Sequence, residues 1–153
     1  CPPHPDWIGE AIVALLEGRA PQLPTKSVCD TCPTIKTGKG NLKHMSRFTH
    51  NAHYDPSKPV SEMHCLLEQG LQCMGAVTRG GCAGKHGEAP RCIQARVPCQ
   101  GCFGPVQQDG NQLLDYLNAL ASNQIDIKSI TEKSTLLEFS GAHGLLRPKV
   151  AGR

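Results

Sequence analysis

The chain has 153 residues, a formal net charge of +3 and only 4% aromatic residues, and its 39% of apolar residues includes nine cysteines. This length allows one domain, but the composition supplies a thin hydrophobic core, so we expect bound groups to act as structural nuclei. The modest charge, without a run of about five or six basic residues, argues against nucleic acid as a partner. No apolar stretch reaches the roughly 18 residues of a membrane span.

The first predicted helix covers residues 7–17. Asp6 can cap its start, and Gly18 can end it. Its apolar stripe consists of Ile8, Ile12, Leu15 and Leu16. The following region, residues 21–60, has little periodicity and many Pro, Gly, Lys and His residues, which predicts an extended loop around a metal site.

Two further helices are predicted along the chain. A short one carries Cys65 and ends at Gly70, before a second ligand-rich loop over residues 73–105. The other covers residues 110–121 and opens with a capping box, because Asp109 is followed three residues later by a glutamine. Its apolar face, which we expect to join the core, consists of Leu113, Leu114, Leu117 and Leu120.

The nine cysteines sort by spacing into one, four and four. Two pairs have a two-residue gap, which lets neighbouring thiolates face one ion or cluster, and two more cysteines are free to complete each pair. The first set consists of Cys29, Cys32, Cys65 and Cys73. The second set consists of Cys82, Cys92, Cys99 and Cys102. Cys1 remains outside both sets.

The spacing distinguishes among the kinds of site that cysteines build. An odd number of cysteines in a chain of this length argues against a disulfide framework. Structural zinc sites usually present two tight pairs, whereas each set here has one tight pair and two ligands separated by seven or nine residues. This asymmetry favours an iron–sulfur cluster, and zinc remains the alternative.

The cysteine-bearing segments resemble the C-terminal, cluster-binding half of the electron-transfer (small) subunit of nickel-iron hydrogenases. The matching residues are Cys1-Pro2-Pro3-His4-Pro5, Val28-Cys29-Asp30-Thr31-Cys32-Pro33, Cys65 to Cys73, Cys82, Cys92 and Pro98 to Pro105. The likeness spans most of residues 1–121, and the joint pattern is highly specific.

The resemblance implies a role for each cysteine. The first set would bind the distal 4Fe-4S cluster, the second set the medial 4Fe-4S cluster, and Cys1 would supply one ligand of a third, proximal 4Fe-4S cluster. Many family members have a histidine in place of Cys29 and a proline in place of Cys92. All-cysteine ligation is similar to the cytoplasmic, methyl-viologen-reducing (F420-non-reducing) branch.

The resemblance also implies a fold class and a division of the chain. We expect a mostly irregular and α-helical, small-core iron–sulfur domain with a few short helices and long ligand loops, C-terminal to a missing flavodoxin-like domain. That domain would be either a separate chain or, as we favour, a part from which this segment was trimmed. Residues 1–24 would end that flavodoxin-like domain, and residues 25–121 would form the two-cluster domain. Residues 122–153 would form a packing tail, with Leu136, Leu137 and Phe139 in a small strand or packing segment.

The function implied is electron relay. Electrons from H2 oxidation at a nickel-iron site on the large subunit would pass through proximal, medial and distal clusters to a flavin- or iron-sulfur-containing acceptor subunit in the cytoplasm. No catalytic residue, nucleic-acid partner or membrane span is expected in this chain. Glu10, Glu68 and Glu88 are expected to be ordinary surface carboxylates. The alternatives are an autonomous two-cluster ferredoxin-like carrier and a zinc-binding interaction module.

Overall fold

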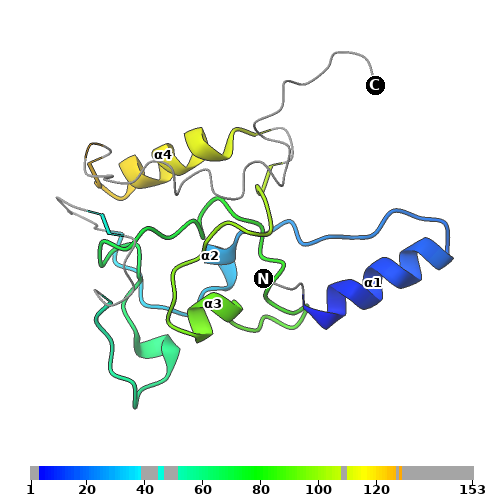
Figure 1. The fold of residues 1–153 in the computed structure, drawn as a ribbon, viewed down its shortest axis with the longest axis horizontal. Coiled ribbons are helices and arrows are strands. Elements are labelled where there is room, and N and C mark those ends of the chain that lie inside the picture. The colour runs from blue at the N-terminus through cyan, green and yellow to red at the C-terminus, as the bar shows by residue number, and fades with distance from the viewer. Residues whose placement is uncertain (1–3, 39–44, 47–51, 108–109, 127, 129–153) are drawn as a thin grey trace.

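The computed structural model describes residues 4–38, 45–46, 52–107, 110–126 and 128. Short helices joined by long loops make up these ranges (Figure 1). The helices in chain order are α1 (Pro5–Leu16), α2 (Val28–Thr31), η2 (Val60–Glu62), α3 (Arg91–Gln94) and α4 (Gln112–Ser122). Strand pairing within the described ranges is limited to isolated bridges. The prediction of a mostly irregular fold with a few short helices is therefore confirmed.

The first predicted helix is present as α1, with a different cap. The side chain of His4, not Asp6, accepts a hydrogen bond from the backbone N–H of Asp6 at the start of the helix. The Asp6 carboxylate instead accepts a hydrogen bond from the backbone N–H of Lys85, at 2.9 Å. Gly18 follows the end of the helix at φ +67°, a conformation that suits glycine.

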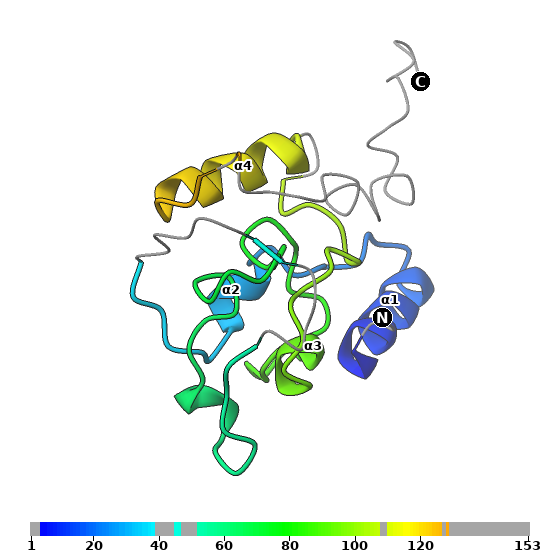
Figure 2. The ribbon, with the colours of Figure 1, turned by 60° about the vertical axis from the view of Figure 1, so that its left-hand side comes forward.

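The apolar stripe of α1 faces away from the described core. Ile8, Ile12, Leu15 and Leu16 are all exposed, and the buried residue of this helix is Ala14. Trp7 anchors the helix to the rest of the chain, because its indole N–H donates a hydrogen bond to the carbonyl of Ala83 at 3.0 Å. Figure 2 shows α1 at the side of the molecule, apart from α4.

The predicted helix around Cys65 is wrong. Cys65 lies in a turn, and the nearest helix upstream is the single 3-10 turn η2. A helix-like hydrogen bond runs from the backbone N–H of Gln69 to the carbonyl of Cys65, but Gly70 then adopts φ +93°. This left-handed residue reverses the chain after one turn, so the helix does not continue.

The last predicted helix is present as α4, but its orientation differs from the prediction. Asn111 caps it by accepting hydrogen bonds from the backbone N–H groups of Leu113 and Leu114, while Asp109 lies outside the described residues. The buried side chains are Gln112, Tyr116 and Leu120, which repeat every four residues. Leu114 is 55% exposed, so its assignment to the core was wrong.

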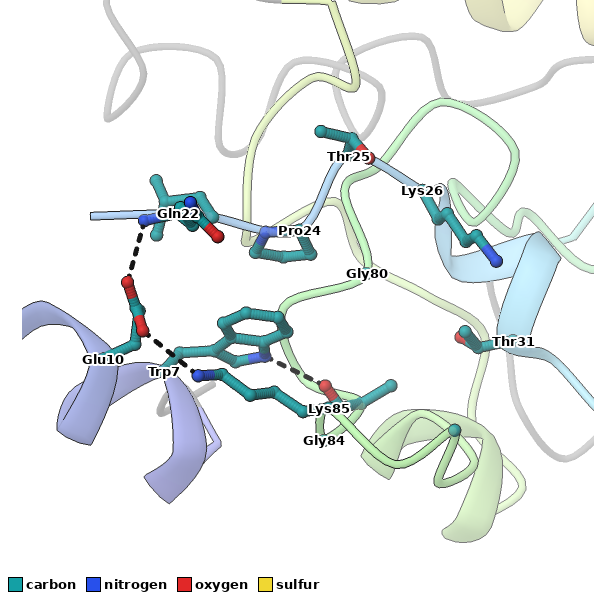
Figure 3. Close-up of a pocket in the computed structure, with 13 residues that line it drawn as sticks. Trp7, Glu10, Gln22, Pro24, Thr25, Lys26, Thr31, Gly80, Gly84 and Lys85 are labelled. Carbon is teal, nitrogen blue, oxygen red and sulfur yellow. Dashed lines mark hydrogen bonds and ion pairs between the residues drawn. The ribbon is translucent and has the colours of Figure 1, made fainter. Parts of the chain in front are cut away.

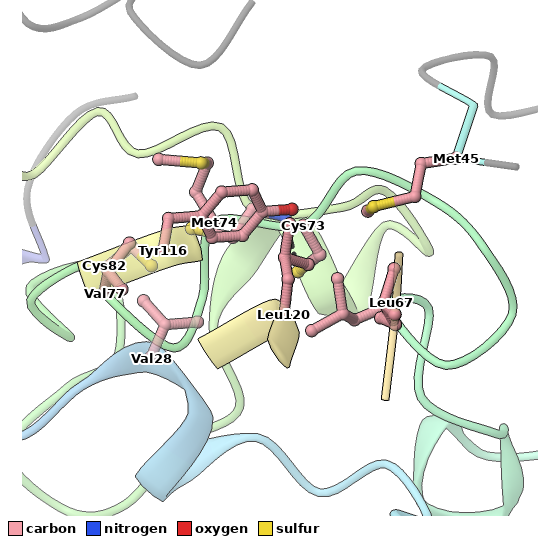
Figure 4. Close-up of a cluster of buried hydrophobic side chains, with 11 residues drawn as sticks. Val28, Met45, Leu67, Cys73, Met74, Val77, Cys82, Tyr116 and Leu120 are labelled. Atoms are coloured by element: carbon pink, nitrogen blue, oxygen red, sulfur yellow. Dashed lines mark hydrogen bonds between the residues drawn. The ribbon is translucent and has the colours of Figure 1, made fainter. Parts of the chain in front are cut away.

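The core contains the cysteines themselves. Tyr116 and Leu120 of α4 belong to its larger cluster (Figure 4). Its buried members are Val28, Met45, Leu67, Cys73, Met74, Val77, Cys82, Cys99, Tyr116, Leu120 and Ile125. A second cluster consists of Met63, Leu66, Leu71 and Ile93. The predicted tail segment with Leu136, Leu137 and Phe139 lies outside the described residues. No helix in the described ranges is long and apolar enough to cross a membrane.

A capping box fixes the short helix α2, which carries Cys29. The hydroxyl of Ser27 accepts a hydrogen bond from the backbone N–H of Asp30, and the Asp30 carboxylate accepts one from the N–H of Ser27 at 2.7 Å. Loss of such a cap costs about 1 kcal/mol. Ser27→Ala should therefore lower the thermal midpoint by about 2–4 °C. Ser57→Ala, in an exposed turn, is the control and should leave the midpoint unchanged.

Candidate metal centre

The four thiols of the first set line one cavity. Cys29 lies in α2 and Cys32 directly follows that helix, while Cys65 lies in the turn after η2 and Cys73 in the next loop. Segments more than thirty residues apart in the chain thus contribute to one site. The rest of the wall combines the apolar side chains of Val28, Leu66, Leu67 and Ile93 with Thr34, Lys36 and Gly75.

Gly75 leaves the space between two of these thiols open. A Cβ atom at this position would lie 3.3 Å from Sγ of Cys29 and 3.5 Å from Sγ of Cys73. Any other residue would therefore fill part of the cavity. The carbonyl of Gly75 also accepts a hydrogen bond from the backbone N–H of Cys29, which fixes the start of α2 against this loop.

Of the first-set cysteines, Cys73 is buried and the other three are partly buried, and the thiols influence one another. Burial raises the pKa of Cys29 to about 12, and the thiols of Cys73, Cys65 and Cys32 contribute to this rise. Lys36 opposes this rise in the pKa of Cys29, and its ammonium donates hydrogen bonds to the carbonyls of Cys29 and Cys32. Thiols with such raised pKa values keep their protons at neutral pH unless a bound metal displaces those protons.

Backbone N–H groups point at the sulfurs of this set. Burial raises the pKa of Cys73 to about 11, and the N–H groups of Cys99 and Gly75 oppose the rise. Burial also raises the pKa of Cys65, against the N–H groups of Glu68 and Leu67. Donors directed at sulfur stabilise a thiolate, which is the form that binds metal.

The second set also comes together. Cys92 lies in α3, and its pKa is raised by burial and then by the thiols of Cys82 and Cys102. The pKa of Cys99 is raised by burial, by Cys73 of the first set and by Cys92. The loop between Cys99 and Cys102 turns at Gly101, where φ is +83°. Cys82, Cys92 and Cys102 thus lie near enough to influence one another, and Cys99 lies near both Cys73 and Cys92.

One hydrogen bond connects the two sets. The backbone N–H of Cys99 donates to Sγ of Cys73 at 3.3 Å, and this contact is buried. Beside it, the N–H of Met74 donates to the carbonyl of Cys99 at 2.8 Å. The two cysteine sets are therefore neighbours and share a fixed stretch of backbone.

Two groups at the site were not expected from the sequence. Glu68 is buried rather than exposed, so its assignment as a surface carboxylate was wrong. Its carboxylate accepts hydrogen bonds from the N–H groups of Thr37 and Gly38 and pairs with His64 at 2.8 Å. These partners hold the loop after Cys32 against the turn that carries Cys65.

Tyr116 is the second unexpected group. Its side chain is fully buried, and its hydroxyl lies at the backbone of Cys73 (Figure 4). Burial raises the pKa of this hydroxyl, and the thiols of Cys73, Cys29 and Cys99, which belong to both cysteine sets, raise it further. The sequence offered one sign of this buried group, because a tyrosine stands among the leucines of the predicted helix.

A groove of about 490 Å³ lies between α1 and the loops that pack beside it (Figure 3). Trp7 and Lys85 line it, and the ammonium of Lys85 lies 5.5 Å from the indole centroid. Glu10 at its edge pairs with Arg19 and Lys85, and these contacts and the N–H of Gln22 lower its pKa to about 2. No cysteine lines this groove among the described residues.

Within the described ranges, no three His, Cys, Asp or Glu side chains form a group that could hold a single metal ion. Cys1 lies outside those ranges.

The comparisons with known proteins identify the relatives of this chain, although no family model matches it. It is 39% identical over 137 residues to the vhu G subunit of the F420-non-reducing hydrogenase of Methanocaldococcus jannaschii, which covers 90% of this chain and 43% of that protein. It is 32% identical over 123 residues to the G subunit of the F420-non-reducing hydrogenase of Methanothermobacter marburgensis. This match covers 80% of this chain and 36% of that protein.

A third relative is named for its cofactor. The chain is 29% identical over 138 residues to the iron-sulfur G subunit of the F420-non-reducing hydrogenase of Archaeoglobus profundus, covering 87% of this chain and 40% of that protein. The chain thus spans less than half the length of these relatives. Over that shared part, its sequence is similar to those of the G subunits of F420-non-reducing hydrogenases, one of which is named an iron-sulfur subunit.

Proposed function

We propose that this chain is the cluster-bearing part of the small subunit of a nickel-iron hydrogenase of the F420-non-reducing type, and that it relays electrons. The observation that carries the proposal is the cavity lined by Cys29, Cys32, Cys65 and Cys73, beside a second group of four thiols. The names of the relatives support the hydrogenase assignment.

The residues of the first site fit a 4Fe-4S cluster. Four cysteines are the ligands that such a cluster requires, and they surround a cavity rather than a point. Gly75 keeps this cavity free of a Cβ atom, and four apolar side chains line part of its wall. Backbone N–H groups directed at Cys65 and Cys73 would stabilise the bound thiolates.

The second set would hold a medial cluster in the same way. Its ligands would be Cys82, Cys92, Cys99 and Cys102. When bound, the two clusters supply one-electron redox chemistry. The chain holds the sites close together, because Cys99 of one set donates its N–H directly to Sγ of Cys73 of the other. Electron tunnelling falls steeply with distance, so this contact would favour transfer between them.

The exposed stripe of α1 supports the proposed division of the chain. Ile8, Ile12, Leu15 and Leu16 form an apolar face of a kind that usually packs against another element. We propose that residues 1–24 end a flavodoxin-like domain, which covers this face, and that Cys1 ligates a proximal cluster there. The partners would be a nickel-iron large subunit and a flavin- or iron-sulfur-containing acceptor, in the cytoplasm.

Metal and sulfide analysis of the complete polypeptide, purified without oxygen together with its partner subunits, tests the proposal. We expect a brown protein in which this chain binds about eight iron atoms and as many acid-labile sulfides. A colourless protein with about two zinc ions and no sulfide would support the zinc-binding module instead. Purification of the chain with clusters but without any hydrogenase large subunit would support the ferredoxin-like carrier.

A further inference from the structure

The hydroxyl of Tyr116 is an unusual group in this core. It is buried with no hydrogen-bond partner in the part of the chain that the structure describes. The backbone N–H of Cys73 lies near enough to influence its pKa without forming a hydrogen bond. A buried polar group without a partner costs about 1–3 kcal/mol. Phenylalanine would fill the same space without this cost, so the hydroxyl calls for a partner that the surrounding protein atoms do not provide while the thiols are neutral.

The surroundings of the hydroxyl indicate what that partner is. Tyr116 belongs to the same buried cluster as Cys73, Cys82 and Cys99, and Leu120, one turn later in α4, is also fully buried there. Figure 4 shows the hydroxyl beside Cys73, which is also the thiol with the largest influence on its pKa. A neutral thiol is a weak acceptor, whereas a thiolate bound to iron carries negative charge and accepts hydrogen bonds.

We propose that the Tyr116 hydroxyl donates a hydrogen bond to the ligated sulfur of Cys73 and thereby raises the reduction potential of the cluster held by the first cysteine set. This inference rests on the proposed function. A phenol is protonated at neutral pH and is therefore a donor. A donor at sulfur stabilises the reduced cluster more than the oxidised one, because the reduced cluster carries the additional negative charge. Tyr116 is thus a positioning and tuning residue rather than a ligand.

The position of Cys73 gives the hydrogen bond a role in the relay. Sγ of Cys73 already accepts the N–H of Cys99, a member of the second set. The second donor would therefore act on the one ligand of the first set that, among the described residues, contacts the second set directly. It would make the first cluster a better electron acceptor relative to the second, and so favour transfer outward.

Tyr116→Phe tests this inference in the complete hydrogenase complex. Iron content is measured first, and the clusters are then titrated with reductant and followed by electron paramagnetic resonance. We expect unchanged iron and a fall in the reduction equilibrium constant of the first cluster on the order of tenfold. That change corresponds to about 59 mV for one electron. Tyr54→Phe is the matched control, because Tyr54 is exposed beside Arg96, and it should titrate as the wild type.

The other outcomes are distinguishable. A Tyr116→Phe variant with full iron and wild-type potentials overturns the inference and leaves the proposed function intact. Loss of iron from this variant also overturns it, because the hydroxyl would then be needed for assembly rather than for tuning. A wild-type complex in which this chain binds no iron overturns the proposed function, and the inference with it.

Discussion

The double variant Cys29→Ala/Cys32→Ala is expected to lose about four of the iron atoms bound by this chain and to retain the other four. The two residues supply half of the first set and lie in and beside α2. Two remaining thiols cannot hold a four-iron cluster. Alanine is preferred to serine because a hydroxyl is itself a possible iron ligand.

The second cluster should survive this change. Cys29 and Cys32 both line the first cavity, and the groups that raise the pKa of Cys92 are burial and the thiols of Cys82 and Cys102. The matched variant is Cys82→Ala/Cys92→Ala, which should lose the other four irons. Measurement of iron, sulfide and paramagnetic resonance signals in both variants would show two independent, complementary losses. Complete loss of iron in both variants would mean that the eight thiols do not form two separate sites.

The grouping of thiols could be predicted because a two-residue gap is a local property of the chain. Such a gap brings Cys29 near Cys32 whatever the rest of the fold does. The more distant partners were assigned in their order along the chain, and in the structure Cys65 and Cys73 line the same cavity as Cys29 and Cys32. The start of α1 was less predictable, because His4 and Asp6 are both able to cap a helix and the nearby Lys85 N–H engages Asp6.

The features that were missed depend on contacts between distant segments. Glu68 is buried because Thr37 and Gly38 donate to it from about thirty residues earlier, and an acidic side chain without known partners is expected at the surface. The rotation of α4 follows from docking on the cysteine loops, which turns Tyr116 inward and Leu114 outward. A row of leucines predicts an amphipathic helix but does not fix its rotation to within one residue.

Gly81→Ala is expected to disrupt the second cysteine set. Gly81 precedes Cys82, and the ring of Phe103, which follows Cys102, lies directly on it. A Cβ atom at position 81 would overlap three atoms of that ring. Because the aromatic ring is rigid, the whole Phe103 side chain has to move away from position 81. This movement separates the two segments that carry Cys82 and Cys102. Overpacking of this severity costs about 3 kcal/mol.

The measurable result should be a lower thermal midpoint together with loss of about four irons from the second site, while the first site keeps its cluster. Gly9→Ala is the matched control. Gly9 lies inside α1, no atom lies within 4 Å of the position that a Cβ atom would take there, and alanine favours a helix by about 1 kcal/mol over glycine. This control should keep all its iron and melt no earlier than the wild type. Equal iron content in Gly81→Ala and Gly9→Ala would show that contact between Gly81 and Phe103 does not hold the second site together. The thiols of the second set would then be positioned by α3 and the Gly101 turn alone.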